Sequence, residues 1–356
     1  MTLSLCMIVK NESDVLARCL SCMEGIADEI IIVDTGSDDR TQDIARQFTT
    51  HVYEFPWSDD FSAARNFSFS KATMDYTMWL DADDYLSEKN RFQLQKLKET
   101  LSTDMAFLRY DVAFDAQGNP TLSYYRERIV RTSLKYHWTG EIHEIIVPQG
   151  SIGYFDIHIE HRKLHPTEKG RNLRIFRKML ADGKTLDSRQ QFYYARELMY
   201  NGDDTAAEAA FLQFLDGGQG WVENQISACL DLCRCQERLG KPDAALATLL
   251  RSFTYDVPRA EICCEIGKVF LSHGQYRTAA FWYETAAASN PAPQNGGFCQ
   301  IDCYGYIPCM QLCVCYDHLG EREKAETWNE KAGALKPNDP AYLYNCSYFA
   351  AQKKEA

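Results

Sequence analysis

The spacing of apolar residues changes near residue 165, and this change divides the sequence into two parts. Before it, short apolar runs alternate with helix-like stretches. From about Pro166 onward, the pattern is helical throughout. Near-continuous apolar strands that alternate with helices predict a mostly parallel sheet covered on both faces. We therefore expect an α/β domain followed by an all-α array.

The predicted strands are rich in β-branched and aromatic residues. They cover Leu3–Val9, Glu29–Asp34, His51–Phe55, Tyr76–Asp81, Met105–Phe114, Leu122–Arg131 and Ile145–Val147. Helices are expected between the first four strands, over Ser13–Met23, Thr41–Phe48 and Phe61–Ala72. Ligands of open parallel sheets bind beyond the carboxyl ends of the strands, so a site is expected at those ends.

The helical part contains an internal repeat marked by turn glycines. Alanine follows each of them five positions later, in the pairs Gly202/Ala207, Gly240/Ala245, Gly274/Ala279 and Gly320/Ala325. Small residues are needed where paired helices cross closely, and Pro291 ends the second helix of the clearest unit. This spacing resembles that of tetratricopeptide repeats, which implies an array of helix pairs whose first and second units are degenerate.

Charge and composition argue against several classes of partner and location. Lys and Arg number 38 against 50 Asp and Glu, giving a net charge of −12, which disfavours nucleic-acid binding and a polybasic membrane anchor. No apolar run approaches the ~20 residues of a transmembrane segment. The N-terminus lacks the cationic lead of a secretory signal. Because most of the 14 cysteines fall in helical stretches, we expect reduced thiols and a cytoplasmic protein.

Three aspartates end the fourth predicted strand, in the run WLDADD. Clustered carboxylates repel one another unless a cation lies between them. Helix capping and turns explain the acidic residues that follow the second strand, but they do not explain three aspartates at one strand tip. Asp-x-Asp at a strand tip suits a hard divalent cation that also binds phosphates. The sequence therefore predicts Mg²⁺ or Mn²⁺ at a nucleotide-diphosphate site, where it would stabilise the departing diphosphate.

Four ordered motifs resemble those of family 2 glycosyltransferases of the GT-A fold: SLCMIVKNE, IIIVDTGSDDRT, FSAARN and WLDADD. The segment WSDDFSAARN and the appended repeats narrow the resemblance to the branch with tetratricopeptide tails. That branch includes bacterial peptide glycosyltransferases, such as the bacteriocin S-glycosyltransferases, alongside many cell-envelope enzymes. We accordingly expect a Rossmann-like GT-A domain over residues 1–165, a linker helix over 166–186 and a repeat domain over 187–356.

The resemblance also implies roles for individual residues. It implies Glu12 and Asp34 near the uracil and ribose of the donor and Arg65 near its phosphates. The full set of predicted nucleotide-sugar-binding residues is Val9, Asn11, Glu12, Asp34, Ser37, Arg65, Asp81 and Ala82. The predicted metal ligands are Asp83, Asp81 and His161, with His158 as the second choice among the histidines.

The segment WTGEIHE, residues 138–144, resembles the Trp-x-Gly-x-Ile-His-Glu segment of the same branch. Sugar transfer with inversion needs a base that takes the proton of the acceptor, and a Glu in a pocket is sufficient. We expect Glu144 to be that base, with Glu141 and Asp84 as the next candidates. A zinc-protease motif is rejected, because it needs a second histidine where Val147 stands.

Together these expectations describe an inverting, metal-dependent hexosyltransferase. It would move glucose or N-acetylglucosamine from a UDP-sugar to a peptide or protein presented by the repeats. One alternative is the same chemistry on a cell-envelope saccharide or lipid. Another is a degenerate transferase domain that holds a tetratricopeptide scaffold, although the intact Asp-x-Asp, Asp34 and Arg65 argue against it. The sequence leaves open the sugar, the acceptor atom and whether the repeats form a homodimer.

Overall fold

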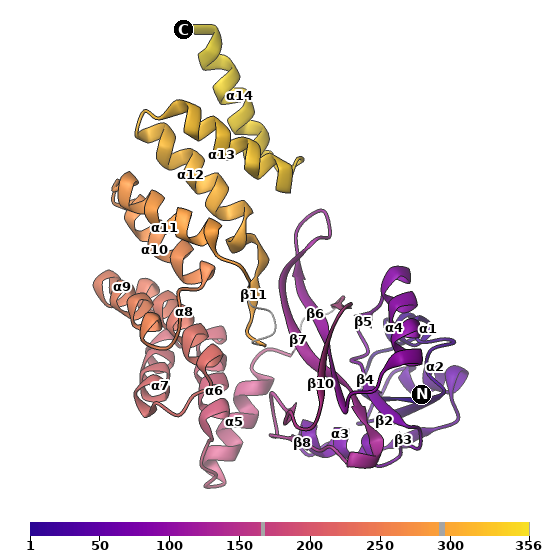
Figure 1. Cartoon of the computed structure of the whole chain (residues 1–356). Helices are drawn as coiled ribbons and strands as arrows, with labels where there is room; N and C mark the ends of the chain where they lie inside the picture. Colours follow the sequence, from indigo (N-terminus) through magenta and orange to yellow (C-terminus); the bar gives the residue numbers. More distant parts are fainter. Residues whose placement is uncertain (165–167, 292–295, 356) are drawn as a thin grey trace. The chain divides into compact units, whose positions relative to one another are not determined.

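The computed structural model describes residues 1–164, 168–291 and 296–355, and the chain forms two compact units (Figure 1). The first unit is Met1–Glu197 and the second is Leu198–Ala356. The first contains a mostly parallel sheet with helices and the second is a helical array, so the predicted fold class is confirmed. Residues 166 and 167, where the predicted linker helix starts, lie outside the described residues.

The sheet of the first unit has the strand order β3-β2-β1-β4-β7-β6-β10-β5. Its strands are β1 (Leu3–Val9), β2 (Glu29–Asp34), β3 (Val52–Glu54), β4 (Tyr76–Trp79), β5 (Asp84–Tyr85), β6 (Met105–Phe114), β7 (Pro120–Arg131) and β10 (Ile152–His161). Strand β1 runs parallel to both β2 and β4, whereas β7 runs antiparallel between β4 and β6. The carboxyl ends of β1, β2 and β4 therefore meet at one edge.

A short hairpin and several helices complete the first unit. The hairpin pairs β8 (Trp138–Thr139) with β9 (Ile145–Ile146), and a 3₁₀ turn covers Thr132–Leu134. The helices are α1 (Leu16–Cys22), α2 (Thr41–Phe48), α3 (Phe61–Phe69), α4 (Glu88–Thr100), α5 (Arg171–Ala181) and α6 (Ser188–Tyr200). Helix α6 starts in the first unit, and its last residues, 198–200, belong to the second.

Both faces of β1 are buried, which explains its near-continuous apolar sequence. On one face Leu5 and Met7 join a core that includes residues of α1 and α4, among them Leu20 and Leu94. On the other face Cys6 packs in a separate cluster with β2 and the aromatic side chains of α3. Helices thus cover the sheet on both sides, as expected for parallel strands.

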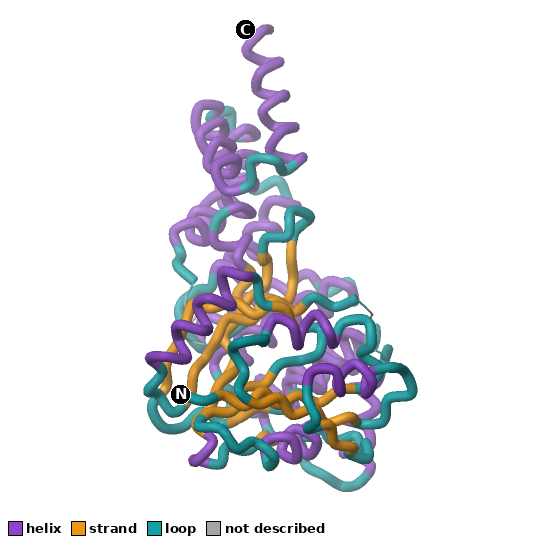
Figure 2. The backbone as a smooth tube through the Cα atoms, turned by 90° about the vertical axis from the view of Figure 1, so that its right-hand side faces the viewer, coloured by secondary structure: helices purple, strands orange, loops and turns teal. Residues whose placement is uncertain are grey.

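The second unit is a succession of antiparallel helices, drawn purple in Figure 2. They are α7 (Asp204–Gly217), α8 (Val222–Arg238), α9 (Pro242–Arg251), α10 (Ala260–Ser272), α11 (Tyr276–Ala288), α12 (Tyr306–His318), α13 (Arg322–Leu335) and α14 (Pro340–Glu355). Two 3₁₀ turns (Ser252–Thr254 and Ile301–Tyr304) and the short strand β11 (Cys299–Gln300) lie between them. Among the described residues, no helix is both long and apolar enough to cross a bilayer.

The repeat glycines make the turns that the sequence predicted. Gly240, Gly274 and Gly320 have φ angles of 71°, 70° and 75°, in the left-handed region that favours glycine at a helix C-terminus. Inside helix α10, Gly267 faces the ring of Tyr283, and a Cβ there would lie 2.9 Å from that ring. The small residue therefore sets how closely α10 and α11 approach.

Candidate active site

A cleft of about 690 Å³ opens in the first unit at the carboxyl ends of β1 and β4. Of the predicted site residues, those that line it are Val9, Asn11, Glu12, Arg65, Asp81, Ala82, Asp83, Glu144 and His161. The predicted residues outside its lining are Asp34, Ser37, Asp84 and Glu141. The strand tips and the segment 138–144, which are far apart in the sequence, therefore contribute to one cavity.

Asp34 and Ser37 hold the loops beside the cleft. Oδ1 of Asp34 accepts hydrogen bonds from the backbone N–H groups of Gly36 and Ser37 at 2.8 Å. The Ser37 hydroxyl in turn accepts one from the Asn11 N–H at 2.9 Å, which joins the loop after β2 to the loop after β1. Oδ2 of Asp34 is buried with no hydrogen-bond partner among the described residues.

The aspartates after β4 form a turn that is closed by its own hydrogen bonds. The Asp84 N–H donates to the Asp81 carbonyl at 3.0 Å, and the Asp81 N–H donates to Oδ2 of Asp84 at 2.9 Å. Asp84 then begins β5, whose register pairs it with His161 at the end of β10. This antiparallel pairing brings the histidine to the aspartates across 77 residues of sequence.

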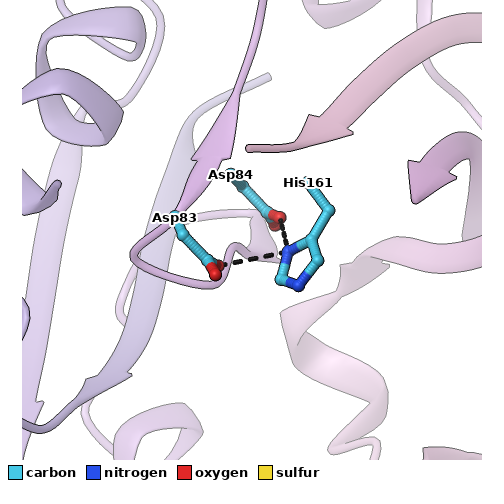
Figure 3. Close-up of side chains that lie close together, drawn as sticks. All are labelled: Asp83, Asp84 and His161. Carbon is cyan, nitrogen blue, oxygen red and sulfur yellow. Dashed lines mark hydrogen bonds and ion pairs between the residues drawn. The ribbon is translucent and has the colours of Figure 1, made fainter. Parts of the chain in front are cut away.

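Asp83, Asp84 and His161 each offer one possible ligand atom, and these atoms lie within 4.8 Å of one another (Figure 3). Nδ1 of His161 lies 3.2 Å from Oδ1 of Asp83 and 3.3 Å from Oδ1 of Asp84. Carboxylate oxygen and imidazole nitrogen suit a divalent cation such as Mn²⁺. The group therefore fits a metal site whose candidate ligands at the cleft are Asp83 and His161, with Asp84 behind them, whereas Asp81 is not part of the group.

Asp84 differs from Asp83 in its surroundings. Its side chain is fully buried and forms an ion pair with Arg128, which is also fully buried, at 2.9 Å. The Tyr110 hydroxyl donates to Oδ1 of Asp84 at 3.0 Å, and burial together with Asp84 raises the pKa of this tyrosine. Because its oxygens already have these partners, Asp84 orients its neighbours, whereas Asp83 and His161 line the cleft.

The aspartates also change the protonation of His161. Burial of the imidazole would lower its pKa, but the hydrogen bonds to Asp83 and Asp84 outweigh burial and raise it to about 10. A metal cation would have to displace this proton, because only the neutral imidazole nitrogen is a ligand.

Arg65 bridges two carboxylates that line the cleft. Its Nη2 donates to Oδ1 of Asp81 and its Nε donates to Oε1 of Glu144, both at 2.7 Å. The guanidinium lies 4.8 Å from the ring centroid of Trp79 and 4.9 Å from that of Trp138. Enclosure alone would raise the pKa of Asp81, but Arg65 outweighs it and keeps that pKa well below its usual range.

Two of the predicted base candidates, Glu141 and Glu144, belong to the hairpin loop that follows β8, and only Glu144 lines the cleft. The Glu141 carboxylate forms an ion pair with Lys184 at 2.5 Å and does not line the cleft. Glu144 turns into the cleft and is largely buried, with 11% of its side chain exposed. Between them His143 has a φ of 52°, a left-handed conformation that costs a non-glycine residue on the order of 1 kcal/mol.

Several cleft residues were absent from the sequence-based prediction. Among them are Tyr110, Arg126, His143, Lys163 and Arg171. A signal for one of them was available, because Arg126 and Arg128 occupy alternate positions of a predicted strand. Alternate residues share a face, so two arginines at alternate positions of a strand that is buried in a sheet indicate a charged partner on that face.

The family follows from comparison with known proteins. Residues 4–162 match the family model described as Glycosyl transferase family 2. This part of the chain is therefore similar to glycosyl transferase family 2. The chain therefore combines a family 2 transferase domain with a tetratricopeptide-like helical array, as the sequence predicted.

Curated relatives match parts of the chain. A TPR repeat-containing protein of Synechococcus elongatus is 48% identical over 83 residues, which are 23% of this chain and 21% of that protein. The prophage-derived glycosyltransferase SunS of Bacillus subtilis is 29% identical over 153 residues, which are 40% of this chain and 34% of SunS. The matches thus span between a fifth and about a third of these relatives. The solved structure of S. aureus TarS 1-349 covers 77% of this chain and 92% of that one, with 14% identity and a TM-score of 0.36.

Proposed function

We propose that the chain is an inverting, metal-dependent glycosyltransferase that uses a UDP-sugar, with glucose or N-acetylglucosamine as the sugar. One observation carries the proposal. The cleft of a family 2 transferase domain brings the Asp83–His161 pair together with Glu144, and Arg65 joins Glu144 to Asp81. A cation-binding end and a carboxylate at the other end are what transfer from a sugar diphosphate requires.

At the donor end, Asp83 and His161 would hold Mg²⁺ or Mn²⁺, which stabilises the negative charge of the departing diphosphate. Asp81 keeps Arg65 in the cleft, and we assign this guanidinium to the diphosphate oxygens. Asp84 and Tyr110 both contact Nδ1 of His161 and fix its ring. The ends of β1 and β2, with Glu12 and Asp34, are assigned to the uridine.

At the acceptor end, we assign Glu144 as the base. The acceptor oxygen or sulfur attacks C1 of the sugar while the bond from C1 to the diphosphate oxygen breaks and its electron pair leaves with UDP. The acceptor proton passes to the Glu144 carboxylate, of which Arg65 holds Oε1. The acceptor that we propose is a peptide or protein presented by the repeat domain, because tetratricopeptide-like arrays provide extended surfaces for protein binding.

The experiment measures UDP release from UDP-glucose and UDP-N-acetylglucosamine with Mn²⁺, using water as the acceptor. We expect turnover that EDTA abolishes and that Asp83→Ala lowers at least about 100-fold. The matched control is Asp156→Ala, which removes a carboxylate whose side chain is 77% exposed, and it should retain turnover. If neither EDTA nor Asp83→Ala lowers the rate of UDP release, the proposed metal dependence is refuted. Absence of any UDP release and of any binding of UDP with Mn²⁺ would favour the scaffold alternative.

A further inference from the structure

Three residues on one face of helix α6 contact His143, which belongs to the hairpin loop that follows β8. Arg189, Tyr193 and Glu197 are spaced four apart, so they lie on one face of the helix, and we call them the α6 clamp. Nε of Arg189 donates to the carbonyl of His143 at 3.2 Å. The Tyr193 ring stacks on the imidazole with centroids 4.1 Å apart and planes 12° apart.

Glu197, the third residue of the α6 clamp, contacts the edge of the His143 ring. Oε1 of Glu197 lies 3.0 Å from Nε2 of His143, and the Glu197 side chain is only 9% exposed. Nδ2 of Asn172, at the start of α5, donates to the same oxygen at 2.9 Å. An ionised carboxylate only accepts hydrogen bonds, so this contact places the proton on Nε2 of the imidazole.

These contacts affect the position of Glu144, because Glu144 directly follows His143 in the sequence. A residue in the left-handed region bends the chain, and both neighbouring side chains then line the cleft. The carbonyl of Glu144 is held separately by Nη2 of Arg126 at 3.3 Å. A strained backbone persists only where its surroundings hold it, and here α6 supplies backbone, stacking and carboxylate contacts to the strained residue.

We propose that Tyr193 and Glu197 act through His143 as positioning residues for Glu144, so that helix α6 is part of the catalytic machinery. The clamp holds His143 in its left-handed conformation and thereby keeps the Glu144 carboxylate at the acceptor end of the cleft. The catalytic meaning of this clamp rests on the proposed function, whereas the clamp itself is a property of the fold.

The kinetic test compares variants in Mn²⁺-dependent UDP release from UDP-glucose. Glu197→Ala and His143→Ala should lower kcat at least about tenfold and leave the donor KM within about twofold, because the donor end is untouched. His143→Gln should recover part of kcat, because its amide nitrogen can take the place of Nε2 and donate to Glu197. The matched control is Glu29→Gln, which alters another His–Glu pair, between His51 and Glu29 at 3.8 Å, and neither of these residues lines the cleft.

Two kinetic outcomes would overturn the proposal. An unchanged kcat in Glu197→Ala would show that the clamp does not position the base. A His143→Gln variant that is as slow as His143→Ala, with unchanged hydrogen exchange in residues 140–146, would show that the imidazole itself reacts, which is a catalytic role and not a positioning one.

A second readout does not depend on turnover. Hydrogen exchange of the backbone amides in residues 140–146 should accelerate at least about tenfold in Glu197→Ala, while exchange in β1 stays as in the parent protein. Unchanged protection of residues 140–146 would overturn the clamp even if activity fell. Faster exchange in a protein that releases no UDP would support the clamp and refute only the proposed function.

Discussion

Asp84 and Arg128 form an ion pair with both side chains fully buried, and Oδ2 and Nη1 lie 2.9 Å apart. The guanidinium also stacks between two aromatic rings, 3.8 Å from the centroid of Trp79 and 4.2 Å from that of Tyr110. The pair lies directly behind the residues that we assign to the metal, because Asp84 contacts His161 on its other side. A charge pair whose side chains have no exposed surface therefore supports the proposed metal site.

Breaking this pair should destabilise the protein strongly. Arg128→Met leaves the Asp84 carboxylate buried without its partner, and we expect the free energy of unfolding to fall by about 3–5 kcal/mol. Urea denaturation measures the change. As a control, Arg131→Met breaks the partly exposed pair with Asp104 and should lower the free energy of unfolding much less. Equal effects of the two substitutions would contradict the special role of the buried pair.

Removing the charge of Glu144 should separate binding from turnover. Glu144→Gln keeps the shape of the side chain but removes the proton acceptor, so kcat for UDP release should fall by about 10²–10⁴. The affinity for UDP with Mn²⁺, measured by calorimetry, should stay within about threefold of the parent. The comparison variant is Glu141→Gln, whose carboxylate pairs with Lys184 outside the cleft, and we expect near-normal kcat. Normal turnover in Glu144→Gln would mean that the base lies elsewhere.

The pair formed by His158 and Asp111 should make stability depend on pH. Nδ1 of His158 lies 2.7 Å from Oδ2 of Asp111, and this hydrogen bond raises the pKa of the imidazole. A pKa raised on folding stabilises the protein below the unfolded value of about 6.5, and that stabilisation is lost as the pH rises through the folded value. The difference in unfolding free energy between the parent and His158→Gln should therefore shrink as the pH rises above the unfolded value of about 6.5 and through the raised folded value.

A control for this prediction is His273→Gln. The ring of His273 is exposed and contacts the carbonyl of Val269, and no carboxylate is within ion-pair distance among the described residues. The effect of His273→Gln on stability gives the baseline over the same pH range. A difference for His158→Gln that stays constant or grows with pH would contradict the assignment.

Close packing within the repeats predicts a sharp contrast between two glycines. Gly267→Ala would place a methyl group 2.9 Å from the Tyr283 ring, and we expect a loss of about 1–3 kcal/mol in unfolding free energy. In Gly217→Ala the new methyl group meets nothing within 4 Å, so stability should stay the same or rise by up to about 1 kcal/mol. Thermal denaturation of the two variants measures the contrast, and similar effects would show that α10 and α11 can move apart.

Local patterns were sufficient to predict the fold class. The change from short apolar strands to a helical repeat is a property of neighbouring residues, and so are the turn glycines of the repeats. The strand tips were informative for the same reason, because a run such as WLDADD joins a buried strand directly to polar residues. These features depend on periodicity within a few residues.

Local patterns could not predict which of two nearby acidic residues lines the cleft. Asp83 and Asp84 are adjacent in sequence, but the pairing of β5 with β10 buries Asp84 against Arg128 and leaves Asp83 at the cleft. Glu141 and Glu144 are three apart, yet the positive φ of His143 turns the chain so that only Glu144 enters the cleft. Both outcomes depend on contacts between distant segments, which residue spacing does not encode.

The position of helix α6 has a practical consequence for dissecting this protein. The family match ends at residue 162, whereas the clamp residues extend to Glu197 and the same helix continues to Tyr200. An expression fragment cut at the edge of the family match would lose every contact that α6 makes with the hairpin loop. Inactivity of such a fragment would be no evidence that the repeats are needed for chemistry, and a fair test of the repeats must keep this helix whole.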